Sequence, residues 1–455
     1  MNFIENSKKF LNKFIGKKET EEINLNIDLK SINPIAPAQY EFLIENNIPT
    51  VEISVINPWQ KDIEDFQVKV RLQDVSDWVS KTHVNVKKTD RTIISMVIPV
   101  SPEKLYNYEE ENLSLDIYCT YTNPMNKKRE FSDSKLIKIL AKDDMIWAIE
   151  KDGKVHDLSH FIAAWVTPRD PEVQKLIHNA AENPEAKSIG GIIGYQSAKK
   201  SETQSKEIVV PPNELKYHKI HLRRGASLSG VLKAVTGGAN NDINFYFFES
   251  NNFILFKDGK NFQYYLGETK ANSGYSFNFI SPIENDYYLV LDNRFSTISD
   301  KIVGIVYKIE TPLSQNEIVG LQAKAMYETI KQNGMNYVHT PVSFAPGNSQ
   351  RVKRPSDTLK FKGGNCIDGS VLFASCFEAI GFLPSIAIIP GHAFVCIKTW
   401  GDSNNYIFIE TTAVSAFNFD KALIPQQEVF SKYKDNLKLI DIKKARELGT
   451  LTRII

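Results

Sequence analysis

The sequence predicts a multidomain α+β protein, with two β-sandwiches followed by a C-terminal α+β domain. The chain has 455 residues, more than a single hydrophobic core usually serves, so several domains are expected. Residues 41–140 and 203–312 repeat short runs in which apolar and polar residues alternate, as they do in half-buried strands. The stretch after residue 312 adds helical spacing to such alternation, which is typical of an α+β domain.

The overall composition argues against some classes of function. The chain has 55 Lys and Arg residues against 54 Asp and Glu residues. It therefore lacks the excess of positive charge that favours binding to a phosphate backbone, and we predict no nucleic-acid partner. No run approaches the ~20 apolar residues that span a bilayer, and the N-terminus lacks the features of a signal peptide. We therefore expect a cytoplasmic protein whose four cysteines are reduced.

Residues 1–40 are predicted to form an N-terminal helix and a polar linker that closes with Pro34 and Pro37. Apolar residues, with lysines between them, fall on one stripe of that helix: Phe3, Ile4, Phe10, Leu11, Phe14 and Ile15. A helix of this kind either lies in a membrane interface or docks as an ordinary terminal helix. The second interpretation is favoured, and the first stays an alternative.

Residues 41–140 are predicted to form an immunoglobulin-like β-sandwich. Six or seven short alternating runs follow one another, separated by turn residues such as Asn57-Pro58. Cys119 shares one strand face with the apolar residue Ile117, so we expect it to pack as a small apolar side chain.

Residues 141–202 lose this alternation and are predicted to form a helical connector. The segment contains His156, His160 and His178. Two histidines four residues apart on a helix can bind a metal ion, but no third ligand converges on them in the sequence. We therefore predict neither a metal site nor any other cofactor.

Residues 203–312 return to alternation and are predicted to form a second β-sandwich of about seven strands, one of them at residues 253–259. From Gly237-Gly238 through YYLVLDNRFS, the segment resembles the small sandwich called the GOLD domain. That resemblance implies a binding or adaptor module with a protein or lipid partner. A purely structural sandwich whose aromatic residues all lie in the core is the alternative.

The residues that carry chemistry lie in the last segment, residues 313–455, which opens with an amphipathic helix predicted at 313–335. Further along, a Gly-Gly-Asn turn signal immediately precedes Cys366, and an apolar helical run follows it. Cys366 therefore falls at the first turn of a buried helix. The helix dipole and the unpaired N–H groups there favour a thiolate, which is the nucleophilic form of cysteine.

Two alternating runs after this helix predict a β-hairpin that brings a base and a carboxylate together. The first run begins at His392 and the second ends at Glu410, with a turn at residues 402–405 between them. Neighbouring strands lie ~5 Å apart, so a carboxylate on one strand can support an imidazole on the other. The order Cys366, His392, Glu410 therefore predicts a nucleophile, a base and an orienting acid.

This arrangement resembles the transglutaminase-like superfamily of papain-type enzymes. The residues that carry the resemblance are Gly364-Asn365-Cys366-Ile367-Asp368, His392-Ala393-Phe394 and Glu410-Thr411-Thr412, and a closer likeness to a bacterial branch covers residues 315–415. In that branch the GYQ sequence at 194–196 runs directly into the helix near Gln315, which implies that the second sandwich is an insertion. The superfamily usually has Asp where this chain has Glu410.

The resemblance implies a cysteine-dependent hydrolase, a peptidase or amidase, that acts through a thioester acyl-enzyme on a protein or peptide substrate. The Cys366 amide is one oxyanion donor by analogy, and the side chain of Gln350 or Asn365 is the candidate for the second. A transglutaminase-type acyl transferase uses the same site with an amine in place of water. A weakly catalytic binding or scaffold protein with this fold is the other alternative.

Four further residues near these motifs are given structural or secondary roles. Asp368 is expected to be a charge in the first turn of the helix, and Cys376 and Cys396 are expected to lie in the core. His339 is a rival base only if the order of elements differs from the one predicted.

Overall fold

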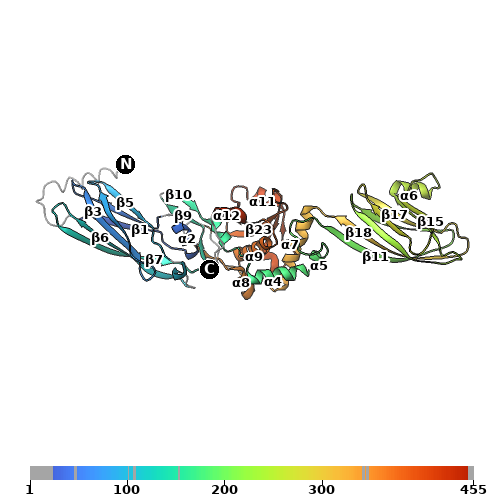
Figure 1. Ribbon diagram of the computed structural model, residues 1–455, viewed down its shortest axis with the longest axis horizontal. Coiled ribbons are helices and arrows are strands. Elements are labelled where there is room, and N and C mark those ends of the chain that lie inside the picture. The colour runs from blue at the N-terminus through green and yellow to red at the C-terminus, as the bar shows by residue number, and fades with distance from the viewer. Residues whose placement is uncertain are drawn as a thin grey trace.

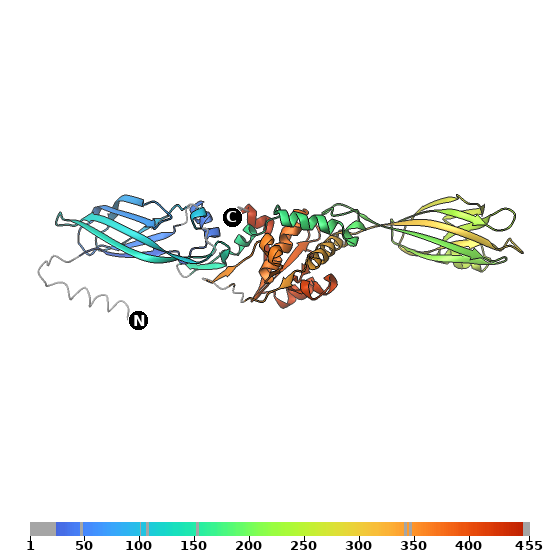
Figure 2. The same ribbon diagram turned by 90° about the horizontal axis from the view of Figure 1, so that it is seen from below.

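The computed structural model describes residues 24–45, 49–100, 102–105, 109–151, 154–340, 344 and 348–448. The apolar stripe predicted between Phe3 and Ile15 lies outside these residues. The described chain mixes helices with a larger share of strands, as predicted for a β-rich multidomain protein. Figure 1 shows three bodies in a row: an N-terminal sheet-rich unit, a central mixed unit and a second sheet-rich unit. The view from below in Figure 2 keeps the same order along the long axis.

The first unit consists of two antiparallel sheets around one core, with strand orders β1-β2-β5 and β4-β3-β6-β7. Cys119 of β6 is fully buried in this core, as expected, and burial raises its pKa to about 12. The elements are β1 (Asn26–Ser31), α2 (Pro37–Glu45), β2 (Val51–Ile56), β3 (Ile63–Leu72), β4 (Val79–Val86), β5 (Arg91–Met96), α3 (Pro102–Leu105), β6 (Glu111–Thr122) and β7 (Lys128–Ile139).

The prediction of a polar linker before residue 41 is wrong for residues 26–31. Strand β1 pairs antiparallel with β2 along its whole length and completes the smaller sheet. Leu25 and Leu29 are buried in the core of the first unit, and Ile27 packs against it. These three residues recur with period two, the spacing of one strand face, so the signal for the strand is present in the sequence.

The central unit is built from two segments that are far apart in the sequence, and its main sheet has the order β25-β24-β23-β22-β26. Helix α9 packs on strands β22 and β23 of this sheet. The elements of the first segment are β8 (Asp144–Ile146), β9 (Ala148–Lys151), β10 (Lys154–Asp157), η1 (Ser159–Ala164), α4 (Pro171–Ala181) and α5 (Pro184–Lys187). Those of the second are α7 (Gln315–Gln332), β19 (Asn336–Tyr337), β20 (Ser349–Arg351), α8 (Pro355–Phe361), β21 (Gly363–Gly364), α9 (Cys366–Ala379), β22 (Pro384–Ile389), β23 (His392–Lys398), β24 (Tyr406–Ile409), η2 (Thr411–Ser415), α10 (Phe419–Ala422), β25 (Leu423–Ile424), α11 (Gln426–Lys432), β26 (Lys438–Asp441) and α12 (Ile442–Glu447).

The segment predicted as a helical connector, residues 141–202, does not form a separate unit. Its residues Phe161, Trp165 and Leu176 lie in the same hydrophobic core as Phe377 of α9. Helix α4 presents an apolar face that must be covered, and α7 and α9 cover it. The boundary predicted between this segment and residues 313–455 is therefore not a boundary of the core.

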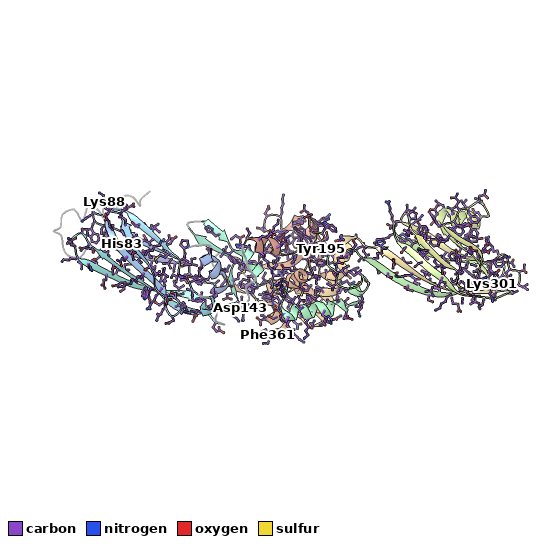
Figure 3. The ribbon with its side chains drawn as sticks, in the orientation of Figure 1. His83, Lys88, Asp143, Tyr195, Lys301 and Phe361 are labelled. Carbon is purple, nitrogen blue, oxygen red and sulfur yellow. The ribbon has the colours of Figure 1, made fainter. Side chains whose placement is uncertain are left out.

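Gln322 of α7 joins the two segments of the central unit. Its fully buried side chain accepts hydrogen bonds from the N–H groups of Ile193 and Gly194, at 2.8 and 2.9 Å, and donates one to the Gly194 carbonyl at 2.9 Å. The next residue, Tyr195, donates from its hydroxyl to the Lys398 carbonyl at 2.8 Å (Figure 3). Gly194, which precedes the second sheet-rich unit, and Gln322, which follows it, are thus hydrogen-bonded to each other.

The second sheet-rich unit contains two four-stranded sheets, with orders β11-β18-β13-β16 and β12-β17-β14-β15, around one core. Its first and last strands pair with each other from Lys199↔Pro312 to Val210↔Lys301, so the unit begins at Lys199 rather than at residue 203. The elements are β11 (Lys199–Val210), β12 (Leu215–Leu222), β13 (Ser227–Thr236), β14 (Ile243–Glu249), α6 (Ser250–Lys257), β15 (Leu266–Ala271), β16 (Ser276–Ile280), β17 (Asn285–Asp292) and β18 (Lys301–Pro312).

The strand predicted at residues 253–259 is wrong, because this stretch belongs mostly to helix α6. Phe253 and Phe256 are buried, whereas Ile254 is exposed, and a spacing of three suits one helix face rather than one strand face. The two buried rings pack with Phe248 and Val290 in a small cluster of their own. The aromatic residues of this segment therefore cover a sheet from outside as well as filling its core.

Candidate active site

Helix α9 begins at Cys366, and local hydrogen bonds determine that start. The Asn365 side chain accepts hydrogen bonds from the N–H groups of Ile367 and Asp368, at 3.1 and 3.0 Å. The Asp368 carboxylate in turn accepts one from the Asn365 N–H at 3.0 Å, which completes a capping box. Cys366 is only 1% exposed and is the first residue of the helix. The thiol thus lies at the positive end of a buried helix.

Two glycines permit close packing around this first turn. A Cβ atom on Gly364 would lie 2.7 Å from the Asp368 Cβ, and one on Gly369 would lie 2.9 Å from the Thr411 Oγ1. The Thr411 hydroxyl donates to the Cys366 carbonyl at 3.4 Å. The start of η2 therefore packs directly on the start of α9, which brings Glu410 close to Cys366 in space.

The predicted hairpin is present and carries the other two candidate residues. Strands β23 and β24 pair antiparallel from Val395↔Ile409 to Lys398↔Tyr406. His392 is the first residue of β23, and Glu410 directly follows β24 as the N-cap of η2. Both residues thus lie at the same end of the hairpin.

The imidazole of His392 is hydrogen-bonded to the Glu410 carboxylate, with Nε2 2.7 Å from Glu410 Oε2. Interaction with Cys366 first, and then with Glu410, raises the pKa of His392 from its ordinary 6.5 to about 10. The ring is therefore an imidazolium at neutral pH.

Glu410 is held by a second residue, Thr412. Its Oε1 accepts hydrogen bonds from the Thr412 hydroxyl at 2.6 Å and from the Thr412 N–H at 3.0 Å, while its Oε2 contacts His392. Burial raises the pKa of Glu410, but the hydrogen bonds from His392 and Thr412 outweigh it and hold that pKa below its ordinary value. The longer side chain of Glu, compared with Asp, thus reaches the imidazole with both oxygens engaged.

The raised pKa of His392 predicts a pH dependence. The imidazolium is present below about pH 10 and is lost as the pH rises through that value, so kcat/KM of any reaction that needs its proton should fall there. Glu410→Gln removes the negative charge beside the ring and should move this alkaline limb to lower pH by about one unit or more. The pH profiles of both proteins, measured with the same amide substrate, check this. An alkaline limb at the same pH in both proteins would contradict it.

The two candidate oxyanion donors occupy different environments. Asn365 uses its side-chain oxygen as the helix cap, and its Nδ2 donates to the Thr340 hydroxyl at 2.8 Å. Gln350 is 7% exposed, and neither of its side-chain amide atoms has a partner among the described residues. Three residues later, the Lys353 N–H donates to Asp368 of the first turn of α9 at 2.8 Å. A buried, unpaired amide on a segment that reaches this turn favours Gln350 over Asn365 as a donor.

The residues with expected structural roles behave accordingly. Asp368 is the N3 residue of the capping box, and Cys376 and Cys396 are fully buried, with pKa values raised by burial. All four cysteines are free, and the described residues hold no group of three His, Cys, Asp or Glu side chains arranged for a metal ion. His339 is exposed beside Tyr337, whereas the imidazole that interacts with Cys366 is that of His392.

The site includes residues that the sequence patterns did not reveal. Tyr337 on β19 is 38% exposed, and β19 packs against η2, whose N-cap is Glu410. It pairs with Gly364 across the parallel β19–β21 ladder. No local motif marks Tyr337, since a two-residue strand has no periodicity. The role of Thr412 could have been predicted only by asking which residue donates to the second oxygen of Glu410.

Comparison with known proteins does not assign the chain to a family. No protein-family model and no curated protein matches it. Among solved structures, the Aeromonas hydrophila periplasmic inhibitor of g-type lysozyme, PliG, is 11% identical, covers 25% of this chain and 86% of its own, and has a TM-score of 0.16. A late embryogenesis abundant protein is 14% identical over 30% of this chain and 81% of its own, with a TM-score of 0.18. The secreted serine protease VesC from Vibrio cholerae is 8% identical over 62% and 50%, with a TM-score of 0.15. TM-scores this low carry no argument about fold or function.

Among the described helices, none combines the length and the apolar composition that a membrane span requires.

Proposed function

We propose that the chain is a cysteine-dependent hydrolase, a peptidase or amidase, with Cys366 as nucleophile. The observation that carries the proposal is the position of His392, which is hydrogen-bonded to Glu410 and interacts with Cys366. A thiol at a helix start beside an imidazolium is the environment that generates reactive thiolates. The same arrangement supports the proposal that the central unit is a transglutaminase-like, papain-type domain.

The proposed reaction proceeds in two halves. The Cys366 thiolate attacks the carbonyl carbon of an amide, and the oxygen becomes an oxyanion that the Cys366 N–H and Gln350 stabilise. As the carbon–nitrogen bond breaks, the His392 imidazolium gives its proton to the leaving amine, and a thioester remains. The neutral imidazole then takes a proton from water, whose oxygen attacks the thioester. The acid product leaves as the thiolate–imidazolium pair re-forms.

The two sheet-rich units are proposed to be accessory modules. The order β1-β2-β5 opposite β4-β3-β6-β7 supports an immunoglobulin-like first sandwich. The second, GOLD-like by sequence, is proposed to be an insertion that binds a protein or lipid partner. Its two connecting strands pair with each other, which is how an insertion returns the chain to its starting point.

Two alternatives keep the same site. An acyl transferase would resolve the thioester with an amine, so adding a primary amine such as a lysine ester would yield an amide product at the expense of hydrolysis. A weakly catalytic scaffold would form no acyl-enzyme at all. The large share of the chain in the two sandwiches is the feature that favours this second alternative.

An acyl probe tests the proposal. A peptidyl acyloxymethyl ketone, which alkylates activated cysteine thiolates, should label the wild-type chain at Cys366, as located by peptide mass spectrometry. Cys366→Ser should abolish labelling, whereas Cys396→Ala should retain it, because Cys396 is buried on the opposite face of the sheet from α9. Labelling that is absent, or that is spread over the other cysteines, would contradict the proposal.

A further inference from the structure

Among the residues that the structure describes, the strand that carries Gln350 pairs with one other strand. In the two-stranded sheet β20–β8, Gln350 lies opposite Met145, and Arg351 opposite Asp144. Each strand has only three residues, a length that gives little stability by itself in water. On the other side of Gln350 the chain is held to α9 by the Lys353 N–H bond to Asp368, so what remains to be explained is how β8 itself is held.

A side chain from the first sandwich occupies the other edge of β8. Gln39 of α2 donates from Nε2 to the Ile146 carbonyl at 2.8 Å and accepts from the Ile146 N–H at 2.9 Å. Its carboxamide thus forms the pair of hydrogen bonds that a neighbouring strand would form. Gln39 and Ile146 are each 4% exposed, so loss of the Gln39 side chain would leave buried backbone groups of Ile146 without these partners.

Further contacts make β8 the junction between the first sandwich and the central unit. Ala36 and Leu140 from the first unit pack against Ile146 in a small cluster. The Arg351 Nε contacts Asp143 Oδ2 at 2.5 Å, and the Val352 N–H donates to the Asp143 carbonyl at 2.9 Å. Figure 1 shows α2 beside β9 at this junction, and Figure 3 places Asp143 there.

We propose that Gln39 is a positioning residue that holds β8 and, through it, the Gln350 amide at the active site. The inference rests on the proposed function, in which Gln350 is the second oxyanion donor. The first sandwich then forms part of the active-site scaffold, and the site is incomplete without it. Gln350, the second oxyanion donor, lies on β20, and the first sandwich holds β20 in place through β8. Cys366, His392 and Glu410, by contrast, are positioned by the central unit alone.

The test compares full-length wild type with Gln39→Met, Gln350→Ala and the double variant. The substrate is the p-nitrophenyl ester of an N-acylated amino acid, which gives kcat and KM, and iodoacetamide separately measures the reactivity of Cys366. Gln39→Met should lower kcat about tenfold or more with little change in KM, since small misplacements of a positioned group are costly. Alkylation, which needs no oxyanion donor, should stay within about twofold of wild type. In the Gln350→Ala background, Gln39→Met should cause no further loss.

The controls separate positioning from general damage. Gln174→Met replaces an exposed glutamine of α4 in the same central unit and should leave every rate unchanged. Hydrogen exchange of the β8 and β20 amides should be faster in Gln39→Met, and this readout needs no activity. Unchanged exchange, or equal losses of kcat with and without Gln350, would overturn the inference. Wild-type chain that iodoacetamide fails to modify at Cys366 would instead overturn the proposed function, and exchange would still decide whether Gln39 holds β20.

Discussion

Replacing His392 with alanine is expected to lower the rate of Cys366 alkylation near pH 6 by about two orders of magnitude. An unassisted cysteine thiol has a pKa near 8.5, so only about 0.3% of it is thiolate at pH 6. A neighbouring imidazolium is what generates reactive thiolates in proteins, and the variant lacks the His392 ring that interacts with Cys366. Turnover should fall further, by about 10⁴-fold, because the proton donor to the leaving group is also removed.

Iodoacetamide labelling followed by peptide mass spectrometry measures this effect residue by residue. His339→Ala is the matched control, since it removes an exposed histidine from the neighbourhood of Tyr337 and should change little. Cys376 and Cys396 are fully buried and serve as internal references that stay unmodified while the chain is folded. Equal labelling rates for wild type and His392→Ala would show that the imidazole does not activate the sulfur.

Replacing Lys301 with methionine is expected to destabilise the second sandwich by about 3–5 kcal/mol. The Lys301 ammonium is 2.8 Å from Asp242 Oδ1, and the two side chains are only 4% and 5% exposed. The same Nζ donates to the Gly237 carbonyl at 2.8 Å. Methionine would leave a carboxylate and a carbonyl buried without their donor, which costs more than the ion pair contributes. Figure 3 places Lys301 at the far end of the molecule, away from the candidate site.

Denaturant unfolding of the full chain, followed by hydrogen exchange of residues 199–312, measures the loss. All five tryptophans lie outside this segment, so their fluorescence should report an unchanged midpoint for the rest of the chain. Lys219→Met is the matched control, because the Lys219–Asp286 pair is 54% and 34% exposed and exposed ion pairs contribute little to stability. Pairing Lys301→Met with Asp242→Leu should restore part of the stability; no recovery would mean that the unpaired carboxylate is not the cause.

The site could be predicted where its signals are local. The Gly-Gly-Asn turn, the capping box formed by Asn365 and Asp368, and the apolar run after it specify a buried helix that begins at Cys366. The hairpin follows from two alternating runs and a short polar turn, so His392 and Glu410 could be assigned to one strand end. These features depend on hydrogen bonds and periodicities within a few residues, which a sequence displays directly.

The predictions of secondary structure and of domain boundaries were wrong where packing between distant segments decides the fold. Residues 253–257 have the composition of a strand, yet they form a helix because Phe253 and Phe256 find an apolar surface outside the second sandwich. Residues 141–202 carry no mark of the core that they share with α9. In each case the partner surface is formed by residues far away in the chain.

By itself, the sequence determined which elements form around Cys366 and in which order the candidate nucleophile, base and acid occur. Only the tertiary structure decided that His392 is bonded to Glu410, that Thr412 holds the same carboxylate, and that Gln39 is bonded to Ile146 of β8. The physical reason is the range of the interactions. Caps, turns and strand alternation act between near neighbours, whereas buried hydrogen bonds such as that of Gln39 to Ile146 link residues 107 positions apart and form only after the units pack together.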